Sequence, residues 1–331
     1  MATVKVVYGT MEFGRRMSKE ESSQVLELFL QSGFNELDTA RMYSNGQSEK
    51  IIGNLPAEFR NKFTIATKAN PIPPNSLRRD SLTDQTNLSL QCLQKQSVDI
   101  LYLHMPDHNT PIKETLEACQ QLYVEGKFKE LGLSNYAAWE VVEAYYICKQ
   151  NGWVVPTVYQ GMYNGITREV EEELFPAIRH LGMRFYAYNP LAGGLLTGKY
   201  KFEAAQEPDR QPVSRFFGTG GTWAKTYRNR YWNEAYFGAI QLIHNSLKKT
   251  YGTHQDGSLK VSLVDAAIRW LKWHSKLSAE QGDGIILGTT SLKQTKEDLD
   301  AYLGGPLDAD VVGVFDEAWQ MTKAFCPHYF R

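Results

Sequence analysis

Hydrophobic and polar positions alternate with two different periods along this chain. Short runs rich in β-branched and aromatic residues are each followed by a longer stretch whose apolar residues recur with helical spacing. The short runs predict strands at Val4–Tyr8, Phe34–Leu37, Phe63–Thr67, Asp99–Leu103, Lys129–Leu133, Thr157–Tyr159, Arg184–Tyr188 and Gly284–Leu287. The longer stretches predict helices near Glu20–Gln31, Ser48–Leu55, Leu77–Gln94, Ile112–Glu125, Trp139–Gln150, Arg168–His180, Ala235–Lys249, Leu263–His274, Leu292–Tyr302 and Ala309–Lys323.

The repeated order of strand and helix predicts an α/β fold, which we interpret as a (β/α)8 TIM barrel. A doubly wound sheet is the alternative, but no G-x-G-x-x-G motif follows the first strand, where that fold places its dinucleotide fingerprint. Residues 189–233 form a long connection with little regular periodicity after the seventh strand. Such connections are often functional. With no linker in the sequence, we expect residues 1–331 to form a single domain, with this long loop and an extra C-terminal helix.

Composition and charge narrow the classes of function. The net charge is -1, so no overall field attracts nucleic acid or acidic lipid. No apolar run approaches the ~18 residues of a membrane span. The four cysteines lie far apart without a C-x-x-C pair, which excludes a zinc ribbon and suits a reducing compartment. Because the N-terminus has no targeting pattern, we expect a cytoplasmic protein that binds neither nucleic acid nor membranes.

Ionisable side chains end three consecutive predicted strands. Asp38 ends the second strand, Lys68 the third and His104 the fourth. Neighbouring strands lie about 4.8 Å apart, so these side chains should converge at the top of the barrel. Tyr43 follows in the loop after Asp38 and can fold back over them. Each residue alone is more often a turn former, a solvated lysine or a packed ring; their coincidence indicates a site.

Together these groups can polarise and protonate a carbonyl oxygen. A tyrosine with a pKa near ~10 is a poor acid–base catalyst at neutral pH unless a cation lowers that pKa. We expect Lys68 to be this cation and Asp38 to hold and balance the lysine. His104, if neutral, can donate a hydrogen bond to a substrate oxygen and orient it. None of these groups supplies electrons, so the reaction needs a hydride donor.

These four residues match, in order and context, the catalytic tetrad of the aldo-keto reductases. The resemblance covers nearly the whole chain. The segments MEFGRRM (11–17), LHMPDH (103–108), GLSNY (132–136) and NPLAGGLLTGKY (189–200) resemble specifically the aflatoxin aldehyde reductase branch, which includes succinic semialdehyde reductases. The resemblance implies a homodimeric enzyme that reduces aldehydes and ketones with NADPH, without a metal, using Tyr43 as general acid. Its implied substrates are dicarbonyls, aflatoxin-type dialdehydes, succinic semialdehyde and related carboxylated aldehydes.

A regulatory protein is the alternative function. The potassium-channel β subunits share the barrel and the tetrad but work as binding partners that sense the cofactor. The branch-specific segments favour the reductase. Turnover separates the two, because a binding module would retain NADPH but consume it very slowly.

The resemblance also implies a set of cofactor contacts along the top of the barrel. Amide and hydroxyl groups after strands five and six would hold the nicotinamide, and Tyr188 would stack on its ring. Residues 189–199 would wrap the pyrophosphate, and Arg215 with residues 288–296 would hold the adenosine end. The implied contacts are Asp38, Ser134, Asn135, Gln160, Tyr188, Asn189, Pro190, Leu191, Gly193, Gly194, Leu195, Lys199, Arg215, Gly288, Thr289, Thr290, Ser291, Gln294 and Asp298, the last standing where the branch has Asn.

For the segment after strand eight, the residues alone leave two interpretations open. Its hydroxyls and backbone amides open a helix, which is a ready-made phosphate site. The other interpretation is a capped helix that binds no ligand.

Substrate contacts follow from the same resemblance. They are Tyr43, His104, Tyr200, Trp223, Tyr227 and the terminal Arg331. The stretch 218–222, just before Trp223, is longer than in the branch. A packed aromatic lid is the alternative for the three aromatic residues of this loop, and a frayed, solvated terminus is the alternative for Arg331.

Two other motifs suggest different chemistry. Residues 193–200 nearly spell a P-loop, but Tyr200 lacks the aliphatic hydroxyl that would ligate Mg²⁺. His104 and His108 have a spacing that converges on a metal in a helix, but Pro106 between them disfavours a helix. The sequence therefore favours neither an NTPase nor a metal site.

Overall fold

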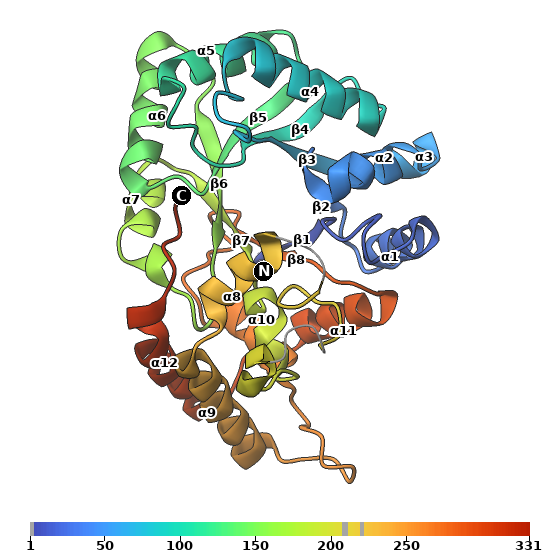
Figure 1. Cartoon of the computed structure of the whole chain (residues 1–331), viewed down its shortest axis with the longest axis vertical. Helices are drawn as coiled ribbons and strands as arrows, with labels where there is room; N and C mark the ends of the chain where they lie inside the picture. Colours follow the sequence, from blue (N-terminus) through green and yellow to red (C-terminus); the bar gives the residue numbers. More distant parts are fainter. Residues whose placement is uncertain (1–2, 207–210, 219–221) are drawn as a thin grey trace.

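Eight parallel strands form the centre of the molecule. The computed structural model describes residues 3–206, 211–218 and 222–331, without the side chains of Thr222 and Trp223. The strands close into a barrel in chain order, with β8 paired to β1, and helices surround them (Figure 1). The strands are β1 (Lys5–Gly9), β2 (Glu36–Asp38), β3 (Thr64–Ala69), β4 (Val98–Leu103), β5 (Phe128–Ser134), β6 (Pro156–Met162), β7 (Arg184–Tyr188) and β8 (Gly284–Leu287). The predicted (β/α)8 barrel is confirmed.

The helices fall close to their predicted positions. They are α1 (Lys19–Gln31), α2 (Gln47–Gly53), α3 (Ala57–Arg60), α4 (Arg79–Leu93), α5 (Ile112–Val124), α6 (Ala138–Asn151), α7 (Leu174–His180), α8 (Thr222–Tyr231), α9 (Glu234–Tyr251), α10 (Leu263–Trp273), α11 (Leu292–Leu303) and α12 (Ala309–Thr322). No helix among the described residues is long and apolar enough to cross a membrane.

Two predictions about helices were wrong. The helix predicted from Arg168 begins only at Leu174. Proline lacks a backbone N–H and is tolerated in the first helical turn, which is where Pro176 lies in α7. The connection 189–233, predicted without regular structure, contains the 3-10 segment Ala192–Thr197 and the helix α8.

Alternate residues of each strand face the inside and the outside of the barrel. Ile100 and Tyr102 of β4 join a small interior cluster, whereas Leu101 and Leu103 pack against the helices. A strand has a side-chain period of two, so the residue two positions beyond an interior residue also points inward. This rule fixes which side chains reach the top of the barrel.

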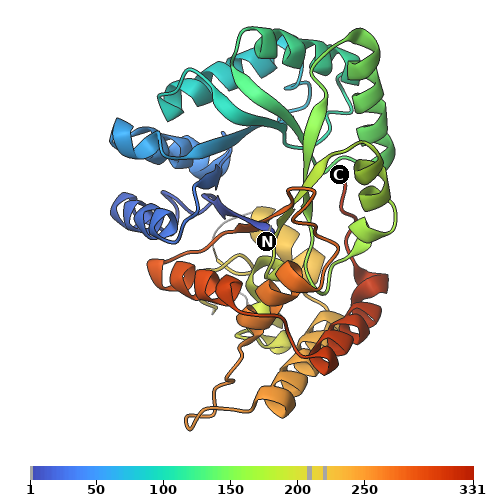
Figure 2. The same cartoon turned by 180° about the vertical axis from the view of Figure 1, so that it is seen from behind.

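The chain end returns to the barrel after α12. Helices α9 and α12 lie side by side, and the C-terminal tail runs from α12 back towards α6 (Figures 1 and 2). The Tyr329 hydroxyl accepts a hydrogen bond from the Ala138 amide at 3.0 Å, and the Arg331 amide donates one to the Asn135 carbonyl at 3.0 Å. Arg331 is therefore held beside the end of β5.

Candidate active site

The strand period points the predicted catalytic residues of β2, β3 and β4 into the top of the barrel. Ala66 and Tyr102 belong to the interior cluster. Lys68 and His104 stand two positions further along β3 and after β4, and Asp38 pairs in register with Ala66. The His104 amide donates to the Ala69 carbonyl at 2.9 Å, which extends the pairing of β3 and β4 by one residue. The convergence expected from the strand ends is therefore present.

Lys68 and Asp38 form a closed, buried ion pair. The Lys68 ammonium donates to both Asp38 carboxylate oxygens at 2.7 Å and to the Thr39 carbonyl at 2.8 Å. Both residues are almost inaccessible to solvent. The Gln160 amide also donates to Asp38 Oδ1 at 2.7 Å. A lysine ammonium has three N–H donors, so every donor of Lys68 is already used.

The expectation that Lys68 lowers the pKa of Tyr43 is not met. Tyr43 opens a 3-10 turn (Tyr43–Gly46), and the Lys68 ammonium lies 5.0 Å from its ring centre. Burial and the Asp38 carboxylate raise the pKa of Tyr43 well above its usual value, and the guanidinium of Arg215 offsets this only in part. The positive charge of Lys68 is balanced by Asp38, and Lys68 has no donor left for the phenol. Tyr43 is therefore a protonated phenol throughout the physiological pH range.

His104 is a neutral imidazole beside this phenol. Its ring lies 6.0 Å from the ring of Tyr43, edge to face. Burial and the nearby Lys68 charge lower the pKa of His104 to about 3. Of the two histidines weighed as metal ligands, His104 contacts Asn70 and His108 contacts Glu140. No metal-type cluster of histidine, cysteine and carboxylate side chains occurs in the described parts of the chain.

A cavity of about 400 Å³ opens over these residues. Its lining includes most of the predicted contacts: Asp38, Tyr43, His104, Ser134, Asn135, Gln160, Tyr188, Asn189, Pro190, Leu191, Gly193, Gly194, Lys199, Tyr200, Arg215, Tyr227, Gly288, Thr289, Thr290, Gln294, Asp298 and Arg331. Lys68, Leu195 and Ser291 do not line it. Lys68 and Leu195 are buried, the former on Asp38. The side chain of Trp223 lies outside the described residues.

One end of the cavity is lined by interlocked amides and hydroxyls. The Tyr188 hydroxyl donates to Asn135 Oδ1 at 2.7 Å, and Asn135 Nδ2 donates to the His104 carbonyl at 2.8 Å. Asn135 Nδ2 also donates to the Ser134 hydroxyl at 3.0 Å. These contacts hold the polar groups of β5 and β7 rigidly beside the imidazole.

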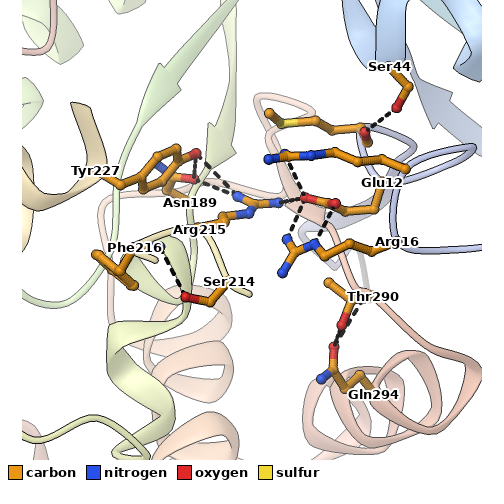
Figure 3. A network of polar contacts seen from close by, with 12 residues as sticks. Glu12, Arg16, Ser44, Asn189, Ser214, Arg215, Phe216, Tyr227, Thr290 and Gln294 are labelled. Carbon is orange, nitrogen blue, oxygen red and sulfur yellow. Dashed lines mark hydrogen bonds and ion pairs between the residues drawn. The ribbon is translucent and has the colours of Figure 1, made fainter. Parts of the chain in front are cut away.

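The middle of the cavity is crossed by a network of charged groups (Figure 3). Arg215 lies between Glu12, 3.4 Å away on the loop after β1, and the Tyr227 hydroxyl, 3.2 Å away on α8. Arg16 donates two short hydrogen bonds to the same Glu12 carboxylate. At Gly193 the backbone has φ 70°, and a Cβ there would lie 2.6 Å from the Tyr227 ring. Glycine is therefore required where the loop approaches this side chain.

At the far end of the cavity, backbone amides at the start of α11 have partners within the protein. The Leu292 amide at the start of α11 donates to Glu21 of α1 at 3.0 Å, and the Gln294 amide donates to the Ser291 hydroxyl at 3.3 Å. Two of the amides expected to bind phosphate are thus already satisfied. The Thr290 amide and hydroxyl both donate to the side-chain oxygen Oε1 of Gln294. The side-chain nitrogen Nε2 of Gln294 takes no part in these two bonds.

Asp298 is a buried carboxyl group at the same end. It lines the cavity with 5% exposure, and no described residue donates a hydrogen bond to it. Burial raises its pKa to about 8, with smaller contributions from Glu297 and Asp265.

The donor set fits a dinucleotide. Amides line one end of the cavity, a guanidinium and a close-approach glycine lie in its middle, and hydroxyl, amide and carboxyl groups line the other end. A sequence profile of the aldo/keto reductase family matches residues 5–320. The chain belongs to the aldo-keto reductase family. Members of this family act on small carbonyl compounds and generally use NAD(P)H, so the protein is an oxidoreductase.

Curated relatives align over nearly all of this aldo-keto reductase. It is 54% identical over 328 residues to aflatoxin B1 aldehyde reductase member 2 of Rattus norvegicus, covering 98% of this chain and 87% of that protein. It is 53% identical over 328 residues to aldo-keto reductase family 7 member A3 of Homo sapiens, covering 98% and 96%. A more distant aldo-keto reductase of Pseudocercospora fijiensis is 38% identical over 310 residues, covering 92% and 100%.

Three further predicted substrate contacts of the aldo-keto reductase, Tyr200, Tyr227 and Arg331, line the same cavity. Tyr200 packs against Phe216, and Tyr227 is buried against Arg215. The Arg331 guanidinium donates to the carbonyls of His328 and Phe330, both at 2.7 Å, through Nη1. The bonds of Tyr329 and the Arg331 amide to Ala138 and Asn135 attach the tail to the barrel, and Arg331 lines the cavity.

Sequence reasoning missed several residues at this site. Met11, Arg16, Met105 and Arg230 also line the cavity. Arg16 and Met105 stand inside segments that carried the resemblance, so proximity to those motifs was an available signal. Arg230 is on α8, which the sequence pattern did not reveal. Asn70 was missed although it stands two positions after Lys68, on the same side of the strand.

Proposed function

We propose that this aldo-keto reductase uses NADPH to reduce aldehydes and ketones to alcohols, with Tyr43 as the proton donor. The substrates we propose are dicarbonyls, aflatoxin-type dialdehydes, succinic semialdehyde and related carboxylated aldehydes. The observation that carries the proposal is the pairing of a protonated phenol, Tyr43, with a neutral imidazole, His104, on one cavity wall. The names of relatives at 53–54% identity, aflatoxin B1 aldehyde reductases among them, support the substrate class.

The cofactor we propose would lie along the cavity. Ser134, Asn135 and Gln160 would bind the nicotinamide amide group, and Tyr188 would pack against the ring. Asn189 to Lys199 would hold the pyrophosphate, and Arg215 with the groups from Gly288 to Asp298 would hold the adenosine end. When bound, NADPH supplies the hydride that adds to the carbonyl carbon. A preference for NADPH over NADH is expected from the charges of Arg215 and the segment after β8.

Tyr43 would protonate the substrate oxygen as negative charge develops on it. The raised pKa of Tyr43 does not prevent this step, because an alkoxide is a far stronger base than a phenolate. His104 would donate a hydrogen bond to the same oxygen and orient the carbonyl. The Lys68–Asp38 pair would position the loop that carries Tyr43, since Lys68 is bonded to the Thr39 carbonyl. A proton from solvent then restores the phenol.

Two arginines of the cavity suit an acidic substrate. Arg331 and Arg230 both line the cavity, and guanidinium groups bind carboxylates in a fixed two-pronged geometry. We propose that Arg331 contacts the carboxylate of acidic aldehydes. From the family resemblance we also propose a single domain over residues 1–331 and a cytoplasmic homodimer.

An NADPH-oxidation assay tests the proposal. The panel is succinic semialdehyde, 2-carboxybenzaldehyde, a dicarbonyl and the uncharged 4-nitrobenzaldehyde, each with NADPH and with NADH. We expect turnover of the panel, a preference for NADPH, and no loss of rate with a strong chelator. Tight NADPH binding with almost no consumption for every substrate would contradict the proposal and favour a cofactor-sensing regulatory subunit. Loss of rate with the chelator would indicate a metal.

A further inference from the structure

Asn70 contacts both sides of the proposed catalytic pair. It follows β3 and lies on the same side of the strand as Lys68, with 5% exposure. Its side-chain nitrogen Nδ2 lies 3.3 Å from His104 Nδ1. The same nitrogen lies 2.7 Å from the sulfur of Met42, the residue before Tyr43. One amide group therefore touches the imidazole and the start of the turn that carries the phenol.

The orientation of this amide is fixed by its other contacts. The Ile72 amide donates to Asn70 Oδ1 at 2.8 Å, so the oxygen faces the backbone and the nitrogen faces His104. The backbone is held as well. The Asn70 amide donates to Gln85 Oε1 at 2.9 Å, and Gln85 Nε2 donates back to the Asn70 carbonyl at 3.2 Å. Rotating the side-chain amide by half a turn would place two donors, the amide nitrogen and the Ile72 N–H, against each other.

The contact decides which ring nitrogen of His104 carries the proton. An amide NH₂ group can only donate, so His104 Nδ1 must accept. Because burial and the nearby Lys68 charge lower the pKa of His104 to about 3, the ring is neutral and holds a single proton. That proton is therefore on Nε2, the nitrogen that Asn70 leaves free for the cavity.

We propose that Asn70 is a positioning residue that locks His104 in the Nε2–H tautomer and steadies the Tyr43 turn through Met42. The catalytic consequence rests on the proposed role of His104 as a donor to the substrate oxygen; the tautomer itself does not. With the proton on Nδ1, the ring would present a lone pair to the carbonyl oxygen, and two acceptors would meet.

The tautomer can be measured without turnover. In protein labelled with ¹⁵N-histidine, protonated and unprotonated ring nitrogens have well-separated chemical shifts. The His104 signals are assigned by their loss in His104→Gln. We expect a neutral ring protonated at Nε2 from about pH 6 to pH 9. A ring protonated at Nδ1, or an equal mixture of both tautomers, in the wild-type protein overturns the proposal.

Asn70→Asp sharpens the test because a carboxylate accepts where the amide donates. We expect it to move the neutral-ring proton to Nδ1 and to lower kcat/KM about tenfold or more at pH 8, with the Kd for NADPH unchanged. The carboxylate also stabilises the imidazolium, which has N–H groups on both nitrogens. The pKa of His104 is therefore higher in this variant than in the wild type, and activity should recover as the pH falls through it. The other charged groups near the ring, Lys68 and Asp38, are bonded to each other, and Tyr43 is protonated.

Asn87→Asp is the matched control. It adds the same charge to an exposed position on α4, and its pH profile should follow the wild type. An unchanged tautomer and an unchanged pH profile in Asn70→Asp overturn the proposal. If Asn70→Asp does not fold, Asn70→Ser is measured instead, with a tautomer mixture expected and a pure Nε2–H ring overturning the proposal. A wild-type protein that has the Nε2–H tautomer but reduces no carbonyl substrate would contradict the proposed function and leave the tautomer proposal standing.

Discussion

The two ends of the cavity are built differently. At the catalytic end, Asp38, Lys68 and His104 stand at the ends of consecutive strands, and the ion pair there is buried and fully bonded. At the nucleotide end, the groups come from long loops and the start of α11. Several of them are bonded to neighbours, as Arg215 is to Glu12 and Ser291 to the Gln294 amide.

The difference separates two kinds of effect. Groups on rigid strands keep a geometry that chemistry requires, whereas loop groups exchange internal partners for a ligand. Substitutions at the catalytic end should therefore affect turnover and folding stability, and substitutions at the nucleotide end should affect binding.

Lys68→Met should have the largest effect. It leaves the Asp38 carboxylate buried without its counter-charge, which lowers the free energy of unfolding by about 3–5 kcal/mol. The same negative charge opposes formation of a phenolate at Tyr43, so turnover should fall at least ~10²-fold. Denaturant unfolding and steady-state rates across pH measure both. The double variant Asp38→Asn with Lys68→Met should recover folding stability but not turnover. An unchanged rate and an unchanged pH profile in Lys68→Met would show that Lys68 has no part in the mechanism.

Arg215→Met tests the nucleotide end. Losing a charged hydrogen-bond donor to phosphate should raise the Kd for NADPH about tenfold or more, because such a bond contributes about 1.5–3 kcal/mol. Turnover at saturating NADPH should change little, and folding stability should hold because Glu12 keeps Arg16. The exposed Lys225→Met on α8 is the control, with an unchanged Kd expected. If Arg215→Met lowered turnover as much as it lowered affinity for NADPH, the two ends of the cavity would not differ in the way proposed.

Arg331→Met tests the proposed contact with acidic aldehydes. The KM for succinic semialdehyde and 2-carboxybenzaldehyde should rise about tenfold, through loss of a charged hydrogen bond. The KM for 4-nitrobenzaldehyde should stay nearly constant. An equal rise in KM for charged and uncharged aldehydes would show that the tail has only a structural role, attached through Tyr329 and the Asn135 carbonyl.

Asp298→Asn should give the smallest effect, one that grows from about pH 4 to about pH 8. The folded-state pKa of Asp298 is raised from 3.8 to about 8, so unfolding releases a proton between these values and stability falls as pH rises through them. Asparagine cannot ionise, so it removes the cost of burying a negative charge at this position. Thermal unfolding should show a midpoint about 4 °C or more above the wild type at pH 9, and the gain should shrink towards pH 4. A gain that is constant across pH would assign the effect to packing.

The sequence predicted the strands well because strand signals are local. β7 and β8 occupy the predicted residues, and the strand ends bring Asp38, Lys68 and His104 together at the top of the barrel. Helix α8 was missed because its polar sequence buries mainly Tyr227 and Tyr231 against groups distant along the chain, such as Phe216 and Asn189.

The details that the sequence did not predict share a cause: each depends on a partner that the sequence does not reveal. The effect of Lys68 on Tyr43 depends on how completely Asp38 and Thr39 occupy the ammonium. The amide at the start of α11 is capped by Glu21, which is far away in sequence and adjacent only because the barrel closes between β8 and β1.

Turnover of Tyr43→Phe is the most direct test of the central claim. The substitution removes only the hydroxyl and leaves the ring that packs beside His104. Because the hydroxyl acts mainly in the transition state, NADPH binding, measured by fluorescence titration, should remain near the wild-type Kd. Carbonyl reduction should fall at least ~10²-fold, the usual range for general acid catalysis. A variant that binds NADPH normally and keeps more than about a tenth of wild-type turnover would contradict Tyr43 as the proton donor.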